Sequence, residues 1–181
     1  MEISKTLYKK LIDKDKKSQI YFYKYCFSVL MRVAIRYKNN KDDAAVLVND
    51  SFLKILQNIA KYDLEKPLEP WLRRITINSA IDDFRKNKKY LATIEKTDTA
   101  QYENTFKTNT AIDEKLNFED LLDVINKLLP KATKVVFLLK NIDGFSHKEI
   151  GKKLEISTET SKWHIKNANK LLRLNKDKLS S

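Results

Sequence analysis

Apolar residues recur at steps of three and four along most of the chain, a period that predicts amphipathic helices. In the N-terminal half this period covers 6–13, 17–37, about 43–60 and 70–89. In the C-terminal half it covers 113–129, 133–141, 146–154 and 157–174. The run VVFLL at 135–139 has the composition of a strand, but its helical flanks favour a buried helix. Glycine (2) and proline (3), which tight turns use, are scarce, so we predict an all-α fold.

The sequence also predicts the environment of individual residues. Ile20 and Ala45 fall on apolar stripes, so we expect both side chains to be buried. A polar turn at 38–43 leads into the next helix, and Asp42 or Asp43 at the end of that turn is expected to cap it. Cys26, the only cysteine, lies among apolar and aromatic residues, which favours a buried thiol over a reactive one.

The helical pattern stops at 92–112, where polar residues dominate without an apolar stripe, as is typical of a flexible linker. We therefore predict two small helical domains, 1–91 and 113–181, joined by that linker. Lys and Arg number 36 against 24 acidic residues, a net charge of +12 that is concentrated in the two domains. This charge favours a polyanionic partner, with nucleic acid ahead of an anionic membrane surface.

Several classes of function are disfavoured. A single cysteine excludes an intrachain disulfide and a cysteine metal cluster. Asp50, Asp82 and Asp83 are the candidate ligands of a metal-dependent nuclease, but adjacent carboxylates on a helix point about 100° apart, which makes them poor co-ligands. We expect no enzyme, metal or cofactor. We also expect a cytoplasmic protein without membrane insertion, because no signal peptide or long apolar run is present.

The helix predicted at 70–89 carries a second, polar face. Arg74, Asn78, Asp82 and then Arg85 or Lys86 follow one another at steps of three and four, so they share one side. The helix ends in RKNKK, with four cations in five residues. Such a face can hydrogen-bond phosphates and bases, although a merely solvated basic helix explains it as well at this point.

The end of the chain has the layout of a helix-turn-helix. Ser146 and Glu149 form a capping-box pattern, a turn follows at 155–157, and Ser157 caps the last helix. Small polar and basic residues occupy the first turns of that helix, where a DNA-reading helix meets base edges. A helical hairpin without a DNA role is the alternative interpretation of this motif. We expect Trp163, which is bulky, to pack against the partner helix.

Taken together, these motifs resemble the extracytoplasmic-function (ECF) sigma factors, the two-domain initiation subunits of bacterial RNA polymerase. The segment 43–55 resembles their polymerase-binding helix, WLRRI at 71–75 with the polar face that follows resembles their promoter-melting helix, and 129–139 with 144–150 resembles the entry to their −35-reading domain. Glu155 stands where the family's turn usually has glycine. A non-glycine residue with positive φ would be mildly strained, so we expect this turn to differ slightly from the family's.

The resemblance implies a protein that binds core RNA polymerase, recognises the −10 and −35 promoter elements and promotes DNA opening. Domain 1–91 would correspond to sigma region 2 and domain 113–181 to sigma region 4. An anti-sigma factor is a further candidate partner. The alternative is a stand-alone helix-turn-helix regulator, which explains the C-terminal domain but not the basic face of the helix at 70–89.

The resemblance also implies three groups of site residues. The polymerase-binding group comprises Asn49, Asp50, Phe52 and Lys54. The −10 and melting group comprises Trp71, Arg73, Arg74, Asn78, Asp82, Arg85, Lys86, Lys88 and Lys89, beside a loop at 61–69 that is a candidate pocket for a flipped base. The −35 group comprises Ser146, His147, Thr158, Thr160, Ser161, Lys162 and Lys166.

Overall fold

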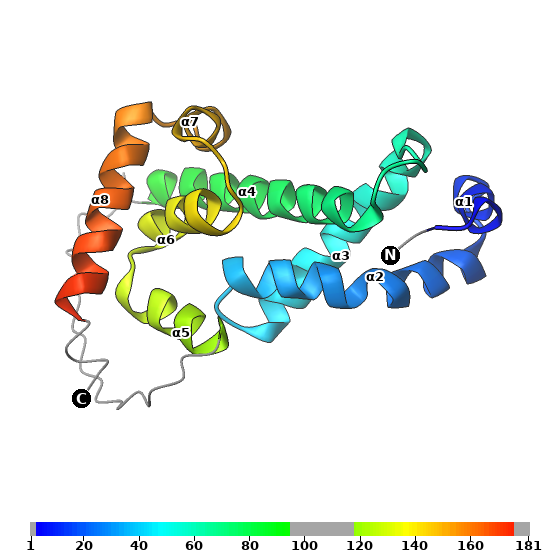
Figure 1. Cartoon of the computed structure of the whole chain (residues 1–181), viewed down its shortest axis with the longest axis horizontal. Helices are drawn as coiled ribbons and strands as arrows, with labels where there is room; N and C mark the ends of the chain where they lie inside the picture. The colour runs from blue at the N-terminus through cyan, green and yellow to red at the C-terminus, as the bar shows by residue number, and fades with distance from the viewer. Residues whose placement is uncertain (1–2, 95–117, 176–181) are drawn as a thin grey trace. The chain divides into compact units, whose positions relative to one another are not determined.

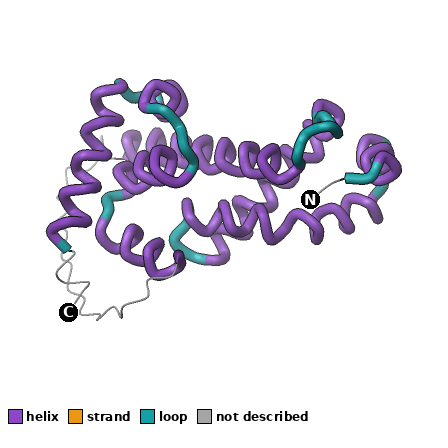
Figure 2. Tube along the Cα trace, viewed as in Figure 1, coloured by secondary structure: helices purple, strands orange, loops and turns teal. Residues whose placement is uncertain are grey.

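The computed structural model describes residues 3–94 and 118–175, with side chains described for 3–87 and 121–175. Within these ranges every regular element is a helix, as Figure 2 shows, so the predicted all-α fold is confirmed. The chain divides into two compact units, Met1–Asn87 and Lys88–Ser181. Most of the stretch predicted as a linker lies outside the described residues, and so do 113–117, the expected start of the next helix.

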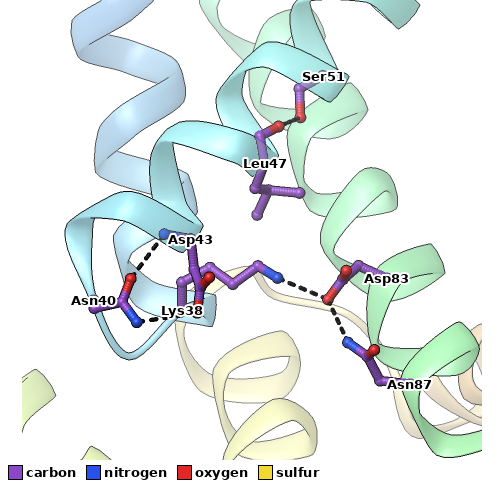
Figure 3. A network of polar contacts seen from close by, with 7 residues as sticks. All are labelled: Lys38, Asn40, Asp43, Leu47, Ser51, Asp83 and Asn87. Atoms are coloured by element: carbon purple, nitrogen blue, oxygen red, sulfur yellow. Dashed lines mark hydrogen bonds and ion pairs between the residues drawn. The ribbon is translucent and has the colours of Figure 1, made fainter. Parts of the chain in front are cut away.

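The N-terminal unit is built from helices whose order follows the predicted pattern (Figure 1). Its elements are α1 (Lys5–Ile12), α2 (Lys16–Tyr37), α3 (Lys41–Asn58), the 3₁₀ turn η1 (Ile59–Lys61) and most of α4 (Leu68–Ile94). The cap of α3 differs from the prediction. Asn40 Oδ1 accepts a hydrogen bond from the backbone N–H of Asp43 at 2.7 Å, so Asn40 is the cap (Figure 3). Asp42 and Asp43 instead lie in the first turn, where their negative charges interact favourably with the positive end of the helix dipole.

Helices α2 and α3 form the centre of this unit. Phe22 is fully buried and its ring lies 6.0 Å from that of Phe52. Cys26 is buried as predicted, and burial raises the pKa of its thiol to about 12, so the thiol is neutral and unreactive at physiological pH. One predicted core position, Ile20, is wrong, because its side chain is exposed. Ala45 is half-buried and its neighbour Ala44 is fully buried, so the inward side of α3 is rotated slightly from the predicted stripe.

Helix α4 begins two residues before the predicted start and extends beyond the predicted end. Pro70 lies in its first turn, where a missing backbone N–H costs no helical hydrogen bond. Leu72, Thr76 and Ala80 are buried and fix which side of α4 faces the core. The helix continues to Ile94, into the first residues of the stretch expected to be a linker.

The C-terminal unit contains α5 (Phe118–Leu128), α6 (Lys131–Phe137), the π-helical turn η2 (Leu138–Ile142), α7 (His147–Leu154) and α8 (Thr158–Leu174). The run VVFLL lies within α6 and η2, which confirms helix over strand. Both hydrogen bonds of the capping box join Ser146 to Glu149, as predicted.

The turn between α7 and α8 is tight. Glu155 has φ 56° and ψ 47°, the left-handed conformation that favours glycine, so a non-glycine residue accepts it in this turn. Gly151 lets the turn come close to α7, because a Cβ at this position would lie 2.8 Å from the carbonyl oxygen of Ile156. The caps, the turn and Gly151 together set how α8 leaves α7.

Candidate nucleic-acid interface

The polar face predicted on α4 lies on the surface of the N-terminal unit. Arg74, Asp82 and Lys86 are exposed, and Asn78 and Arg85 are half-buried. They lie away from the buried side that Leu72, Thr76 and Ala80 define. The side chains of Lys88 and Lys89 lie outside the described residues.

Two adjacent acids of α4 form separate ion pairs. Asp82 Oδ2 lies 2.8 Å from Lys54 Nζ on α3. Asp83 Oδ2 accepts hydrogen bonds from Lys38 Nζ at 2.8 Å and from Asn87 Nδ2 at 3.1 Å (Figure 3). The acids therefore join α4 to its neighbours in different directions. No group of three or more His, Cys, Asp or Glu side chains suited to a metal is found in the described part of the chain.

Arg73 lies away from the exposed face. Its Nε donates a hydrogen bond to Glu69 Oε1 at 3.0 Å, and Arg32 approaches the same carboxylate at 3.7 Å. The predicted site residue Arg73 is therefore engaged with Glu69, one turn earlier on α4, and is only half exposed. We assign it a role in holding the start of α4.

Aromatic residues fasten the loop that precedes α4. The buried ring of Tyr62 lies 4.9 Å from the ring of Trp71, and its hydroxyl donates to the carbonyl oxygen of Lys66. Tyr8 of α1 reaches the other side of the loop, with its hydroxyl 3.3 Å from the carbonyl oxygens of Ala60 and Tyr62. Trp71, predicted to contact DNA, is thus half-buried against the loop.

The residues predicted to bind polymerase separate into a surface group and a structural group. Asn49 and Asp50 are exposed on α3, and Asn49 Oδ1 accepts a hydrogen bond from the hydroxyl of Tyr23 at 2.8 Å. Phe52 belongs to the core, where its ring lies 5.0 Å from that of Tyr23. Lys54 is held by Asp82. Phe52 therefore shapes α3 from inside and does not offer its ring to a partner.

Two exposed apolar residues of α3 were missed by the sequence analysis. The side chains of Val46 and Leu53 are 60% and 58% exposed. They are seven residues apart, which places them on one face of the helix together with Asn49 and Asp50. The signal was present in the sequence, since apolar residues that recur within a polar helix face indicate a contact surface.

In the helix-turn-helix, Ser161 does not lie on the surface. It is fully buried, and its Oγ lies 3.0 Å from His147 Nδ1 on α7. The prediction that Ser161 contacts DNA is therefore wrong: a small hydroxyl can be buried when a hydrogen-bond partner is supplied. Burial, followed by the charges of Lys140 and Lys162, lowers the pKa of His147. The imidazole is thus held mainly neutral near pH 7.

The exposed face of α8 is basic. Lys162, Lys166 and Lys170 are exposed, as their spacing predicted. Thr158 and Thr160 are half-buried, and the backbone N–H of Thr160 donates to the Ser157 cap at 2.9 Å. Ser146, the cap of α7, is exposed.

Trp163 departs from its prediction. Its side chain was expected to pack against the partner helix but is 58% exposed. Its ring instead lies edge-on to the neighbouring His164, 5.0 Å between centroids. Bulk and hydrophobicity suggested burial, but the position of Trp163 on α8 points it outward.

None of the helices in the described ranges combines the length and the apolar character that a membrane span requires.

Comparison with known proteins gives matches to both units. The family Sigma-70 region 2 matches residues 22–90 and the family Sigma-70, region 4 matches 118–172, together more than half of the chain. RNA polymerase sigma factor SigV of Bacillus subtilis is 28% identical over 143 residues, 79% of this chain and 81% of its own length. ECF RNA polymerase sigma factor SigW of the same organism is 28% identical over 151 residues, 80% of this chain and 81% of its own length.

Among solved structures, the sigma factor RpoE in complex with the anti-sigma factor NepR from Bartonella quintana has the same fold. The TM-score is 0.50 at 21% identity, over 86% of this chain and 96% of that one. The two sigma regions follow one another along the chain in the order that its motifs predicted. The chain belongs to the sigma-70 family and is an ECF sigma factor.

Proposed function

We propose that this sigma factor binds core RNA polymerase, recognises the −10 and −35 promoter elements and promotes DNA opening, acting by binding and not by catalysis. The observation that carries the proposal is the sorting of charge on α4. Its acids Asp82 and Asp83 are paired with lysines of neighbouring elements, whereas Arg74 and Lys86 are exposed on one face. A face sorted in this way attracts a nucleic-acid backbone.

DNA opening requires a surface that prefers separated strands. Cations bind the backbone of a single strand, while aromatic and polar groups receive unstacked bases. On α4 we assign the first task to Arg74, Arg85 and Lys86, with Lys88 and Lys89 continuing the basic run along the sequence. Asn78, with its amide, is the candidate for contact with a base. The loop at 61–67, fastened by Tyr62, is the candidate pocket for a base that leaves the stack.

Duplex recognition is assigned to the C-terminal unit. Lys162 and Lys166 are exposed on α8 and are suited to phosphate contacts along a groove. Thr158 and Thr160 lie in the first turn of α8, the part of a recognition helix that reaches base edges. Ser146 and His147 lie at the start of α7, and we assign them contacts with the backbone of the same duplex.

Binding to polymerase is assigned to the exposed face of α3. Val46 and Leu53 supply apolar area, and Asn49 and Asp50 supply polar contacts between them. A face that combines exposed apolar side chains with polar ones is typical of a protein–protein interface. RpoE, the solved relative, is bound to the anti-sigma factor NepR, and we propose a partner of that class here as well.

Run-off transcription tests the proposed function. Purified chain and core RNA polymerase are supplied with a library of promoter fragments, and core polymerase alone is the control. We expect specific transcripts only when the chain is present. A stand-alone regulator would bind DNA but would not direct transcription by core polymerase. DNA binding without any specific transcript would therefore overturn the proposal.

A further inference from the structure

Trp163 is a large apolar side chain that the proposed function does not yet use. It lies on α8, and 58% of its side chain is exposed. Lys166 and Lys170 follow it by three and seven residues, so all three share one face of the helix. The exposed indole is therefore part of the basic face proposed to meet DNA.

The indole is held in place by a chain of contacts that begins in the interior. Thr133 of α6 is buried, and its Oγ1 lies 2.9 Å from His164 Nδ1. The imidazole of His164 in turn lies against the ring of Trp163, with an interplanar angle of 73°. An aromatic ring that is positioned in advance loses little conformational entropy on binding. Trp163 thus has the properties of a prepared contact residue.

We propose that Trp163 determines specificity by packing against the C5 methyl group of a thymine in the major groove, with Thr133 and His164 as positioning residues. The inference rests on the proposed function, because α8 must enter duplex DNA for the contact to form. In the major groove the thymine methyl is the apolar feature by which base pairs differ. The neighbouring lysines hold phosphates, which carry no sequence information by themselves.

Replacement of thymine by uracil tests this contact directly. Uracil lacks the C5 methyl group but keeps the hydrogen-bonding groups of thymine. The full-length chain, bound to core RNA polymerase, is used to select a promoter duplex from a randomised library. Each thymine of the upstream element is then replaced in turn by uracil and the Kd is measured. We expect a loss of about fourfold in affinity at one position, the value for burial of one methyl group.

Variants at position 163 assign the effect to the indole. The Trp163→Ala variant should bind the thymine and the uracil duplex with equal affinity, and each more weakly than the parent protein does. The Trp163→Phe variant should keep part of the preference for thymine. Leu174→Ala is the matched control, because Leu174 is an exposed apolar residue in the last turn of the same helix, 63% exposed. This control should keep the full thymine preference. Since Trp163 is largely exposed, its removal should leave the fold intact, which circular dichroism checks.

The positioning role has a separate readout. Thr133→Val removes the hydroxyl that holds His164 and should reduce the thymine-to-uracil ratio, while Thr133→Ser keeps a hydroxyl and should restore it. The inference is overturned if no thymine is sensitive to uracil, or if Trp163→Ala keeps the wild-type ratio. If the Trp163 inference fails in this way but specific transcription is still seen, the proposed function stands. If the chain with core polymerase binds no promoter duplex, both the inference and the proposed function are contradicted.

Discussion

Lys54 Nζ lies 2.8 Å from Asp82 Oδ2, so an ion pair joins the helix proposed to bind polymerase to the helix proposed to open DNA. Both side chains are about half exposed, at 41% and 49%. A pair in this environment contributes about 0.2–1 kcal/mol, which is too little to hold the unit together. Its role is better understood as electrostatic, because it neutralises an acid that would otherwise repel a phosphate backbone.

Exchange of the two charges tests that role. Lys54→Ala and Asp82→Ala should each lower the free energy of unfolding by less than about 1 kcal/mol. The double variant Lys54→Asp with Asp82→Lys should recover that stability in urea unfolding, because the pair is re-formed in the opposite sense. We expect it to keep promoter opening. A stable double variant that still binds core polymerase but fails to open promoters would show that Asp82 itself contacts DNA.

Charge reversal on α3 tests the proposed polymerase surface. Asp50 is exposed, so Asp50→Lys should leave the fold unchanged. We expect affinity for core polymerase to fall at least about tenfold, which corresponds to about 1.4 kcal/mol. Asp63→Lys, at an exposed acid in the loop before α4, is the control for net charge. Wild-type affinity of the Asp50 variant in a pull-down would remove Asp50 from the interface.

The apolar part of that surface makes an independent prediction. Leu53→Ser should weaken binding to core polymerase while leaving stability nearly unchanged, because the side chain is already exposed. Ile12→Ser, at an exposed apolar residue of α1, is the matched control and should bind normally. Equal binding by the two variants would contradict a role for Leu53. Affinity is measured by titrating labelled protein with core polymerase.

His147 predicts a pH dependence of the C-terminal unit. Its pKa is lowered below the ordinary 6.5, first by burial and then by Lys140 and Lys162. Between the two pKa values the unfolded chain binds more protons than the folded one, so stability rises with pH in that window. The contribution of neutral His147 to the free energy of unfolding is fully present above pH 6.5. It is lost as the pH falls through the lower pKa of the folded state.

The measurement compares urea midpoints at about pH 7.5 and about pH 5, where histidine changes its charge. Trp163 fluorescence in a Trp71→Phe background reports on this unit alone, since the chain has two tryptophans. His147→Gln should show a smaller loss of stability at the lower pH than the parent protein. His164 is present in both proteins, so it does not affect the comparison. An equal loss in both would rule out His147 as the source.

The helices of the chain were predictable because each combines an apolar period with local capping signals. Ser146 and Ser157 cap their helices as predicted. Errors arose where a local pattern leaves the rotation or the first residue of a helix open. Ile20 is exposed, and α3 begins early enough for Asn40 to take the capping role expected of Asp42 or Asp43.

The site was less predictable because its contacts join residues far apart in the sequence. The partnership of Lys54 with Asp82 and that of Ser161 with His147 depend on how helices pack. Helical spacing and the family resemblance assigned Asp82 and Ser161 to the DNA surface, and the bulk of Trp163 suggested packing against the partner helix. Tertiary hydrogen bonds hold the first two, and the outward position of Trp163 on α8 leaves its ring exposed.

The central claim is that the basic face of α4 opens promoter DNA, and its most direct measurement is open-complex formation by a variant of that face. Arg85, Lys86, Lys88 and Lys89 are replaced together by Ala, and strand separation is followed by the reactivity of promoter thymines to permanganate. The control variant replaces four exposed lysines far from this face in the sequence, Lys5, Lys9, Lys10 and Lys17, so its net charge is the same.

We expect the α4 variant to bind core polymerase with nearly wild-type affinity but to leave the promoter thymines unreactive, because the separated strands lose their backbone contacts. The control variant should open the promoter normally. Normal permanganate reactivity with the α4 variant would contradict the account.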